Sequence, residues 1–415
     1  MSSYFIKECR LCNEKQLTEV ANFGNVPLGN NLVDSPEYSR KAKTYPLGIN
    51  RCLSCGHFQL SFSVDPKELY ATNYTYLSSI GHSFSIHQSR YVEWLDYETK
   101  ALTNRFVFEI GSNDGSLLKK FRMKGFKVCG VDPASIASEK ANNHGIKTFN
   151  EFYSSTTNNK ILQVYKRPDL VVSQNVLAHI DNLLEVFENV YELLDFGGFF
   201  SFEIGYFLSV FEDNLFDTIY HEHLDYHHAN PLVNVLNRIG FSVTSLSKHS
   251  VQGGSLRVLC VKRKECINSR LVHQFIKDEL HSSIYDDYLI KNWMKRIILN
   301  LEDTKKIIVD AHKQGKKIIG YGSPTKAVLL AKLLELDKTI IPYTLEDNDL
   351  KVGKFLPLTS IEIKSSDLIK SDKDVKYILI FAWNFSEDII SKIRSKQISN
   401  VKAIIPLPEL KIIDL

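Results

Sequence analysis

The chain lacks any hydrophobic run of the roughly 18 residues that a membrane-spanning helix needs. Residues 1–7 also lack the basic region and the apolar run of about 7–15 residues that mark a secretory signal peptide. Neither sign of charge is in large excess, because 51 basic residues are nearly balanced by 48 acidic residues and the formal net charge is +3. This balance gives no strong field for nucleic acid. We therefore expect a cytoplasmic protein whose partners include neither a membrane nor a nucleic acid.

The seven cysteines are an odd number, and in a reducing compartment they favour a metal site over disulfides. Four of them form two C-x-x-C pairs, Cys9 with Cys12 and Cys52 with Cys55. Two such pairs can wrap one ion through four thiolates, and Zn²⁺ is the usual occupant. Four unrelated reduced cysteines or a redox dithiol are the alternatives. Because four thiolates leave no open position for substrate, a zinc site here is predicted to be structural.

Residues 106–118 change from a strand pattern to a helix pattern at a glycine turn, FVFEI-GSNDG-SLL. Gly111 and Gly115 would let the backbone approach a ligand at the carboxyl end of the strand. The dinucleotide fingerprint G-x-G-x-x-G is absent, because Asn113 stands at its second glycine. The pattern around Glu109 instead resembles the first motif of class I methyltransferases, which bind S-adenosylmethionine. The next predicted strand ends at Asp132, where an acid can accept ribose hydroxyls; a glycine turn of purely structural use is the alternative.

Residues 216–228 form the most unusual stretch, FDTIYHEHLDYHH. A metal could use His221 and His223, although no third ligand is obvious nearby. A solvated polar loop would account for His227 and His228. Acid–base chemistry fits His223, because an imidazole titrates near neutral pH and the adjacent Glu222 can orient it. We favour the acid–base interpretation.

Three further features complete the pattern along the chain. Residues 251–258 place Arg257 beside a glycine turn suited to an anion, and residues 284–314 keep the apolar period of one long amphipathic helix. Residues 317–327 then repeat the order of strand, glycine turn and helix start, with Lys326 as a counter-charge for a phosphate. This second nucleotide-type fold could hold a nucleotide-linked substrate or be purely structural.

Taken together, these motifs resemble, in the same order, those of the zinc-containing sugar C-methyltransferases of deoxysugar biosynthesis. The resemblance implies an α/β protein with an N-terminal zinc-binding region (1–80), a central class I methyltransferase Rossmann-like domain (81–283) and a C-terminal Rossmann-like domain (284–415). It implies methylation of carbon 3 of a nucleotide-linked 4-keto-6-deoxyhexose, in which a base removes a proton and the ketone delocalises the charge as an enolate. Methylation of a sugar hydroxyl, and a non-catalytic protein that binds zinc and nucleotide sugar, are the alternatives.

The resemblance assigns roles by motif position to some of the candidate residues, and the others follow from the patterns described above. His223 would be the base, and the residues placed around the sugar and the enolate oxygen would be Tyr220, Glu222, His179 and Tyr76. The candidate residues for S-adenosylmethionine are Glu109, Gly111, Asn113, Gly115, Asp132 and Asn175. The candidate residues for the nucleotide-linked substrate are Arg257, Tyr321 and Lys326. The zinc ligands would be Cys9, Cys12, Cys52 and Cys55. The oligomeric state is left open.

Overall fold

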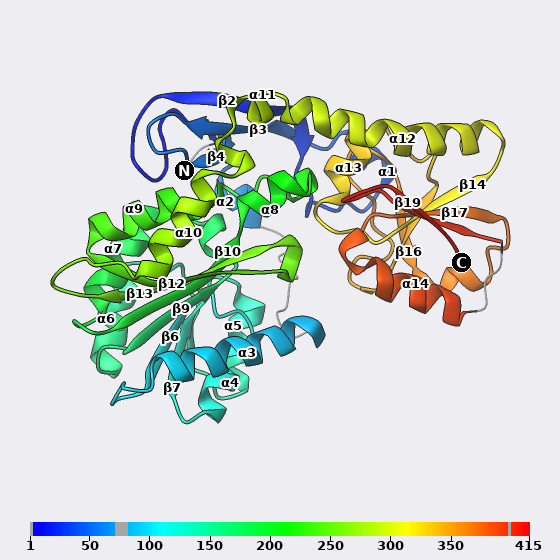
Figure 1. Cartoon of the computed structure of the whole chain (residues 1–415). Coiled ribbons are helices and arrows are strands. Elements are labelled where there is room, and N and C mark those ends of the chain that lie inside the picture. Colours follow the sequence, from blue (N-terminus) through cyan, green and yellow to red (C-terminus); the bar gives the residue numbers. More distant parts are fainter. Residues whose placement is uncertain (1–2, 71–81, 397–399) are drawn as a thin grey trace.

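The structure is a computed structural model that describes residues 3–70, 82–396 and 400–415. In these ranges the strands form three larger sheets and one two-stranded sheet (Figure 1). Tyr76, with most of the tyrosine-rich stretch at 70–79, lies outside the described residues.

The N-terminal unit is built on an antiparallel sheet with the strand order β11-β4-β3-β2. β11 does not come from the first residues of the chain: Asp225 pairs with Gln59, so a strand within the histidine-rich stretch completes this sheet. The two-stranded sheet joins β1 and β5. The elements are β1 (Tyr4–Phe5), β2 (Leu17–Pro27), α1 (Pro36–Arg40), β3 (Thr44–Cys52), β4 (Phe58–Leu60), β5 (Phe62–Ser63), α2 (Pro66–Tyr70) and β11 (Asp225–Tyr226).

The central unit contains a seven-stranded sheet with the order β12-β13-β10-β9-β6-β7-β8. β13 runs antiparallel to both of its neighbours, and the other pairs are parallel. The strands are β6 (Phe106–Ile110), β7 (Lys127–Val131), β8 (Thr148–Phe149), β9 (Leu170–Gln174), β10 (Phe199–Gly205), β12 (Phe241–His249) and β13 (Ser255–Lys262). The α-helices are α3 (His82–Glu98), α4 (Ser116–Met123), α5 (Ser135–Asn143), α6 (Ser155–Val164), α7 (Leu183–Leu193), α8 (Phe207–Glu212), α9 (Ala229–Ile239) and α10 (Arg270–Leu280). Three short 3₁₀ helices, η2 (Leu177–His179), η3 (Phe216–Thr218) and η4 (Val251–Gly253), lie in its loops.

The direction of the chain across this sheet reverses next to β6. From β6 the chain moves outward to β7 and β8, and it then returns to β9 on the other side of β6. In open α/β sheets, ligands bind outside the carboxyl ends of the strands at such a switch point. The predicted strand–turn–helix at residues 106–118 is confirmed, and its turn lies at this switch point.

The C-terminal unit repeats this reversal in a six-stranded sheet with the order β16-β15-β14-β17-β18-β19. All of its strand pairs are parallel except that of β18 with β19. The turn after β14, at residues 322–326, therefore lies at a second switch point between β14 and β17. The elements are β14 (Lys317–Tyr321), α13 (Ala327–Leu333), β15 (Tyr343–Glu346), β16 (Glu362–Ser365), η6 (Ser366–Lys370), β17 (Val375–Ile380), η7 (Trp383–Phe385), α14 (Ser386–Ser395), β18 (Lys402–Ile405) and β19 (Lys411–Asp414).

The prediction of one long helix over residues 284–314 is wrong in its first third. The structure has η5 (Ser283–Tyr285), α11 (Asp287–Lys291) and then α12 (Trp293–Lys313). The break falls at Asn292, whose side-chain amide donates to the backbone carbonyl of Tyr288 at 2.8 Å. Asparagine competes in this way for backbone hydrogen bonds, so it favours helix ends over helix interiors.

The N-terminal unit and α12 lie along one side of both other units (Figure 1). At one end of α12, Trp293 packs against Phe207 and Phe211 of α8. On α13, the Lys332 ammonium donates to the carbonyl of Phe23 in β2 at 2.8 Å. The three units are thus packed together through buried contacts, and the domain limits at 80 and 283 remain predictions.

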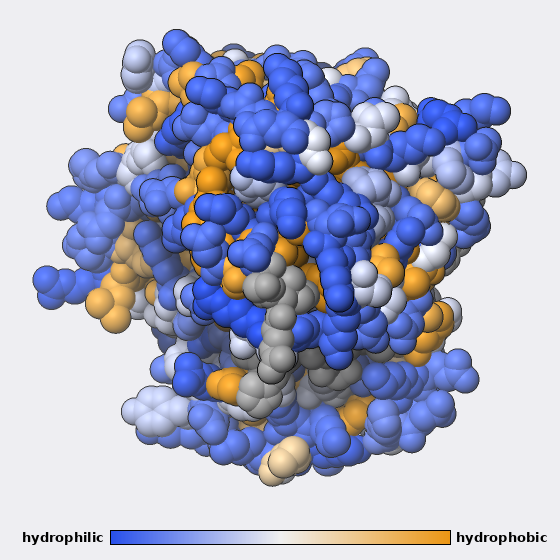
Figure 2. All heavy atoms as spheres, turned by 90° about the vertical axis from the view of Figure 1, so that its right-hand side faces the viewer, coloured by the Kyte–Doolittle hydropathy of each residue, from blue (hydrophilic) through white to orange (hydrophobic). Residues whose placement is uncertain are grey.

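The surface in Figure 2 is mostly hydrophilic, with hydrophobic residues in small groups between charged and polar ones. Among the described residues, we find no helix with the length and apolar character needed to cross a membrane.

Candidate active site

The four cysteines of the two C-x-x-C pairs come together at one end of the N-terminal sheet. Their Sγ atoms all lie within 4.8 Å of one another, and the Cys9–Cys55 and Cys12–Cys52 pairs are 3.5 Å and 3.6 Å apart. A Zn–S distance of about 2.3 Å in a tetrahedron places the sulfurs roughly 3.8 Å apart. The donor set and its spacing therefore fit one zinc ion held by four thiolates.

The turn after β6 is shaped for a ligand at the first switch point. Gly111 has φ +72°, and a Cβ there would lie 2.3 Å from Cγ2 of Val176, so no side chain fits. The backbone amide of Asn113 donates to Oδ2 of Asp132, and that of Ala134 donates to Oδ1, both at 2.8 Å. These two bonds fix the Asp132 carboxylate at the end of β7, and each oxygen keeps a lone pair for a further donor.

Glu109 is buried on β6 beside this turn, and its Oε2 has no hydrogen-bond partner among the described residues. Burial, with Asp132 and Asp114 nearby, raises the pKa of Glu109 well above its ordinary value. A buried acceptor without a donor is costly unless a ligand supplies one. Asn175 (φ +55°) follows β9 on the other side of the switch point, and Gly115 (φ +75°) precedes α4. These residues therefore fit a ligand that carries hydroxyl and amino donors, as S-adenosylmethionine does.

Tyr220, His223 and His179 form one cluster, as the sequence predicts. The Nδ1 of His223 lies 2.9 Å from the carbonyl oxygen of Thr218, which can only accept, so Nδ1 carries the proton. Nε2 is then the acceptor, and the Tyr220 hydroxyl donates to it at 2.8 Å. The ring centroid of His179 is 4.8 Å from that of His223. Burial lowers the pKa of His223 to about 3 and that of His179 to about 4, so both rings are neutral at neutral pH.

Glu222 points toward the other two units of the protein. Its Oε1 accepts from the side-chain amide of Asn30 at 3.1 Å, and the Asn30 oxygen accepts from the Thr325 hydroxyl at 2.6 Å. Oε2 is buried and has no partner among the described residues. Burial raises the pKa of Glu222 to about 7, so near neutral pH this carboxyl group is partly protonated and able to donate. The chain from Thr325 through Asn30 thus joins the C-terminal glycine turn to the histidine-rich segment.

Lys326 is not free to face a phosphate, which corrects its expected place at the mouth of the C-terminal turn. Its ammonium lies 3.5 Å from Oδ2 of Asp217 and 3.8 Å from the centroid of the Trp383 ring. Burial lowers the pKa of Lys326, and Trp383 donates to the same Asp217 oxygen. Through these contacts Lys326, which immediately precedes α13, connects that helix to η3.

Arg257 also lies away from an exposed anion site. It is buried in β13, where its Nε donates to Glu203 at 2.6 Å and its guanidinium lies over the rings of Tyr91 and Trp94. Tyr321, by contrast, reaches the second switch point, where its hydroxyl donates to Asp347 at 3.2 Å.

The remaining histidines of the stretch are structural. The ring of His221 contacts the carbonyl of Pro46 in β3 at 3.2 Å, away from the candidate catalytic group. His227 and His228 are buried, so the solvated-loop interpretation of them is wrong. The loop folds inward because β11 joins it to the N-terminal sheet.

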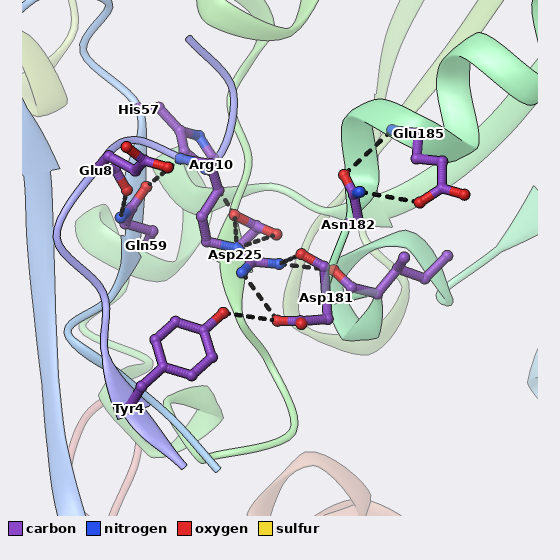
Figure 3. Close-up of polar contacts among 10 residues, drawn as sticks. Tyr4, Glu8, Arg10, His57, Gln59, Asp181, Asn182, Glu185 and Asp225 are labelled. Carbon is purple, nitrogen blue, oxygen red and sulfur yellow. Dashed lines mark hydrogen bonds and ion pairs between the residues drawn. The ribbon is translucent and has the colours of Figure 1, made fainter. Parts of the chain in front are cut away.

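Sequence reasoning missed three contributors to this site: Arg10, Asn30 and Asp217. Asn30 stands in a glycine-rich segment whose pattern gave no role, and Asp217 stands at the start of the histidine-rich stretch. Arg10 lies between two predicted zinc ligands, where its side chain drew no attention, yet it binds the loop after His179 (Figure 3).

Three family profiles match consecutive parts of the chain: a zinc binding domain over residues 9–70, a methyltransferase domain over 87–246 and a C-methyltransferase C-terminal domain over 250–408. The C-methyltransferase NovU of Streptomyces niveus is 29% identical over 410 residues, which cover 98% of this chain and 97% of NovU. Together with the four-cysteine cluster, these matches support a zinc-containing C-methyltransferase family for this chain. It is an S-adenosylmethionine-dependent C-methyltransferase, and S-adenosylmethionine and zinc are its cofactors.

Solved structures similar to this C-methyltransferase include two bacterial methyltransferases. The magnesium protoporphyrin IX methyltransferase of Synechocystis, solved with S-adenosylmethionine, is 16% identical, with a TM-score of 0.33 over 43% of this chain and 79% of that one. An S-adenosylmethionine-dependent methyltransferase of Clostridium acetobutylicum is 14% identical, with a TM-score of 0.36 over 43% of this chain and 92% of that one.

Proposed function

We propose that this enzyme methylates carbon 3 of a nucleotide-linked 4-keto-6-deoxyhexose through an enolate. The observation that carries the proposal is the neutral Tyr220–His223 pair, with a carboxyl group of raised pKa on Glu222 between them in the sequence. Forming a carbon–carbon bond requires a carbanion, and a ketone beside the reacting carbon is what makes its proton acidic enough for a side-chain base.

The Tyr220–His223 pair supplies the base. His223 Nε2 holds a lone pair at neutral pH, and its fixed tautomer aims that lone pair at the Tyr220 hydroxyl. The substrate proton leaves carbon 3 for the Tyr220 oxygen as the tyrosine proton moves to Nε2, or it passes to Nε2 directly. A buried imidazole resists becoming charged, and a negative enolate forming beside it offsets that cost.

Glu222 supplies a donor for the enolate oxygen. Near neutral pH its carboxyl group is partly protonated, and the buried Oε2 is available to donate to oxygen 4 of the sugar. A neutral carboxylic acid in an apolar site stabilises an enolate in this way. The His179 ring, whose centroid lies 4.8 Å from that of His223, would line the same side of the substrate, and we keep Tyr76 as a further candidate.

The methyl group lies on a sulfonium when S-adenosylmethionine is bound. We propose that Asp132 binds its ribose hydroxyls and that Glu109, Asn113 and Asn175 hold its polar groups, with Gly111 and Gly115 giving room for close approach. These residues would place the methyl carbon against carbon 3 and exclude water. Bound there, S-adenosylmethionine would supply an electrophilic methyl group to the carbanion, with a neutral thioether as the leaving group.

We assign the binding of the substrate's nucleotide part to the turn after β14. The Ser323 amide donates to Glu346 at the end of β15 at 2.9 Å, just as Asn113 donates to Asp132 at the end of β7. Gly322 (φ +88°) packs against Ala382 as Gly111 packs against Val176. An acid in this position binds ribose in nucleotide folds. The Glu346 oxygens already accept from the Ser323 amide and hydroxyl and from the Asp347 and Asn348 amides, so the shared turn geometry, with Tyr321 beside it, is what supports a nucleoside site.

Product analysis tests the proposal. The purified enzyme is incubated with S-adenosylmethionine and a panel of nucleotide-linked sugars, in which each 4-keto-6-deoxyhexose is matched by its 4-hydroxy counterpart. We expect one methyl group, located on carbon 3 by NMR, and only on the keto sugars. A methyl group on oxygen, or equal methylation of the 4-hydroxy sugars, would contradict it.

A further inference from the structure

We propose that Arg10 is a positioning residue, through which the zinc-binding turn holds the two loops that carry His179 and His223. Arg10 lies between Cys9 and Cys12, so its backbone is fixed by the C-x-x-C turn. Its side chain leaves the N-terminal unit and enters the central unit (Figure 3). The inference rests on the proposed function, in which His179 and His223 face the substrate.

One guanidinium reaches both loops at once. Its Nη2 donates to the carbonyls of Ile180 and Asp181, at 2.7 Å and 2.6 Å, and these two residues directly follow His179. Its Nε donates to both carboxylate oxygens of Asp225, at 3.0 Å and 3.1 Å. Asp225 comes two residues after His223, so Arg10 connects the segments on which both histidines stand.

The surroundings of Arg10 leave it little freedom. The exposed fraction of its side chain is 6%, and that of Asp225 is 0%. His57 Nε2 contacts the same carboxylate at 2.9 Å, and the Arg10 backbone amide donates to Gln59 at 2.9 Å. A planar guanidinium with five donors can make this set of bonds, whereas a lysine ammonium at the end of a flexible chain cannot.

The two loops are also bonded to each other. The Leu224 amide donates to the Ala178 carbonyl at 2.7 Å, and within the second loop the His223 amide donates to the Tyr220 carbonyl at 2.9 Å. Arg10 therefore holds the two loops together. Its loss would let the distance between the His179 and His223 rings vary, although both rings would still be present.

Two variants test this inference. Arg10→Lys keeps the charge but loses the fork of bonds. Because that variant leaves Asp225 poorly paired and could fold badly, the double variant Arg10→Met with Asp225→Asn removes both charges, while the introduced side-chain amide can still bond His57. The matched control is Arg238→Lys, because Arg238 donates to the Leu11 carbonyl of the same zinc-binding turn at 2.8 Å, and among the described residues it has no hydrogen bond to either loop.

Hydrogen–deuterium exchange gives a readout that needs no substrate. We expect faster amide exchange in residues 177–181 and 219–226 of both test variants, with zinc content and S-adenosylmethionine affinity as in wild type. The Arg238→Lys control should keep wild-type protection. Unchanged exchange in both loops of the folded double variant would overturn the inference, whatever the substrate proves to be.

Turnover gives the functional readout, measured with whichever panel sugar the wild type methylates. We expect kcat to fall at least about tenfold in both test variants, with the KM for S-adenosylmethionine unchanged, because the cofactor site is not touched. Wild-type kcat in the double variant would overturn the inference. Failure of the wild type on every keto sugar would count against the proposed function, and the exchange result would still decide the role of Arg10.

Discussion

At the scale of single residues, the site depends on keeping unusual protonation states. Burial holds His223 neutral, with a pKa of about 3, and pushes the pKa of Glu222 up to about 7. One group is thereby able to accept a proton and the other to donate one within the same pH range. Opposed shifts of this kind in neighbouring groups mark an acid–base site.

Glu222→Gln should change the pH profile more than the rate. Wild-type kcat is expected to fall as pH rises through about 7, because the protonated carboxyl group is lost. The glutamine amide remains a donor at every pH, and its oxygen still accepts from Asn30, so the alkaline fall should disappear. The check is kcat between pH 6 and 9, with S-adenosylmethionine affinity measured over the same range. An unchanged alkaline fall in the variant would remove Glu222 from this role.

His223→Ala should lower kcat by about 10²–10⁴, the usual contribution of a general base, while S-adenosylmethionine still binds. Tyr220→Phe separates the two proton routes, because it removes only the hydroxyl that bonds Nε2. A fall of about tenfold or more places the tyrosine on the route. Full activity of Tyr220→Phe would mean that the proton passes directly to His223, and full activity of His223→Ala would exclude His223 as the base.

At the scale of elements, the segment with Gly29 and Asn30 packs against the C-terminal turn that carries Thr325, and this contact helps to hold the site together. A Cβ on Gly29 would lie 2.2 Å from the backbone carbonyl oxygen of Thr325. That close approach is what brings Asn30 within reach of both Thr325 and Glu222.

Gly29→Ala should therefore separate the two segments and break the Asn30 bridge. We expect kcat to fall and the pKa read from the alkaline limb of the pH profile to change, since Glu222 loses its partner. Gly315→Ala is the control: it strains a left-handed residue (φ +68°) with nothing within 4 Å of the added Cβ, so about 1 kcal/mol of stability is lost with kcat unchanged. Wild-type kcat and pH profile in Gly29→Ala would contradict the bridge.

Local elements could be predicted from the sequence, and contacts between units could not. The strand, turn and helix around Gly111 and the C-x-x-C pairs are read from neighbouring residues, and both are confirmed. The Arg10–Asp225 and Asn30–Glu222 contacts join segments far apart in the chain, and no period or spacing encodes them. The break at Asn292 was missed because the apolar period continues across it.

At the scale of the whole molecule, the N-terminal unit contacts the histidine-rich stretch that carries the candidate site. Its sheet includes β11, which lies within the histidine-rich stretch, and its zinc-binding turn carries Arg10. The C-terminal unit reaches the same segment through Lys326 and Asp217. The segment with Tyr220 and His223 is thus held by both flanking units.

Zinc removal should lower the thermal stability of the protein. A strong chelator, or Cys12→Ser, is expected to reduce Tm and to loosen the N-terminal sheet, because structural zinc contributes folding free energy directly. The matched control is Cys266→Ser, since Cys266 is exposed and lies outside the cluster. Metal analysis should give one zinc per chain. Purified protein without zinc, or an unchanged Tm in Cys12→Ser, would contradict the site.

The most direct test of the enolate route is hydrogen exchange at carbon 3 in deuterated water. The enzyme is incubated with a nucleotide-linked 4-keto-6-deoxyhexose and S-adenosylhomocysteine, so that no methyl group can be transferred, and deuterium at carbon 3 is followed by mass spectrometry and NMR. Our account predicts that the wild type introduces deuterium there above the enzyme-free rate and that His223→Ala does not. Methyl transfer by the wild type without any such exchange, or equal exchange in His223→Ala, would contradict it.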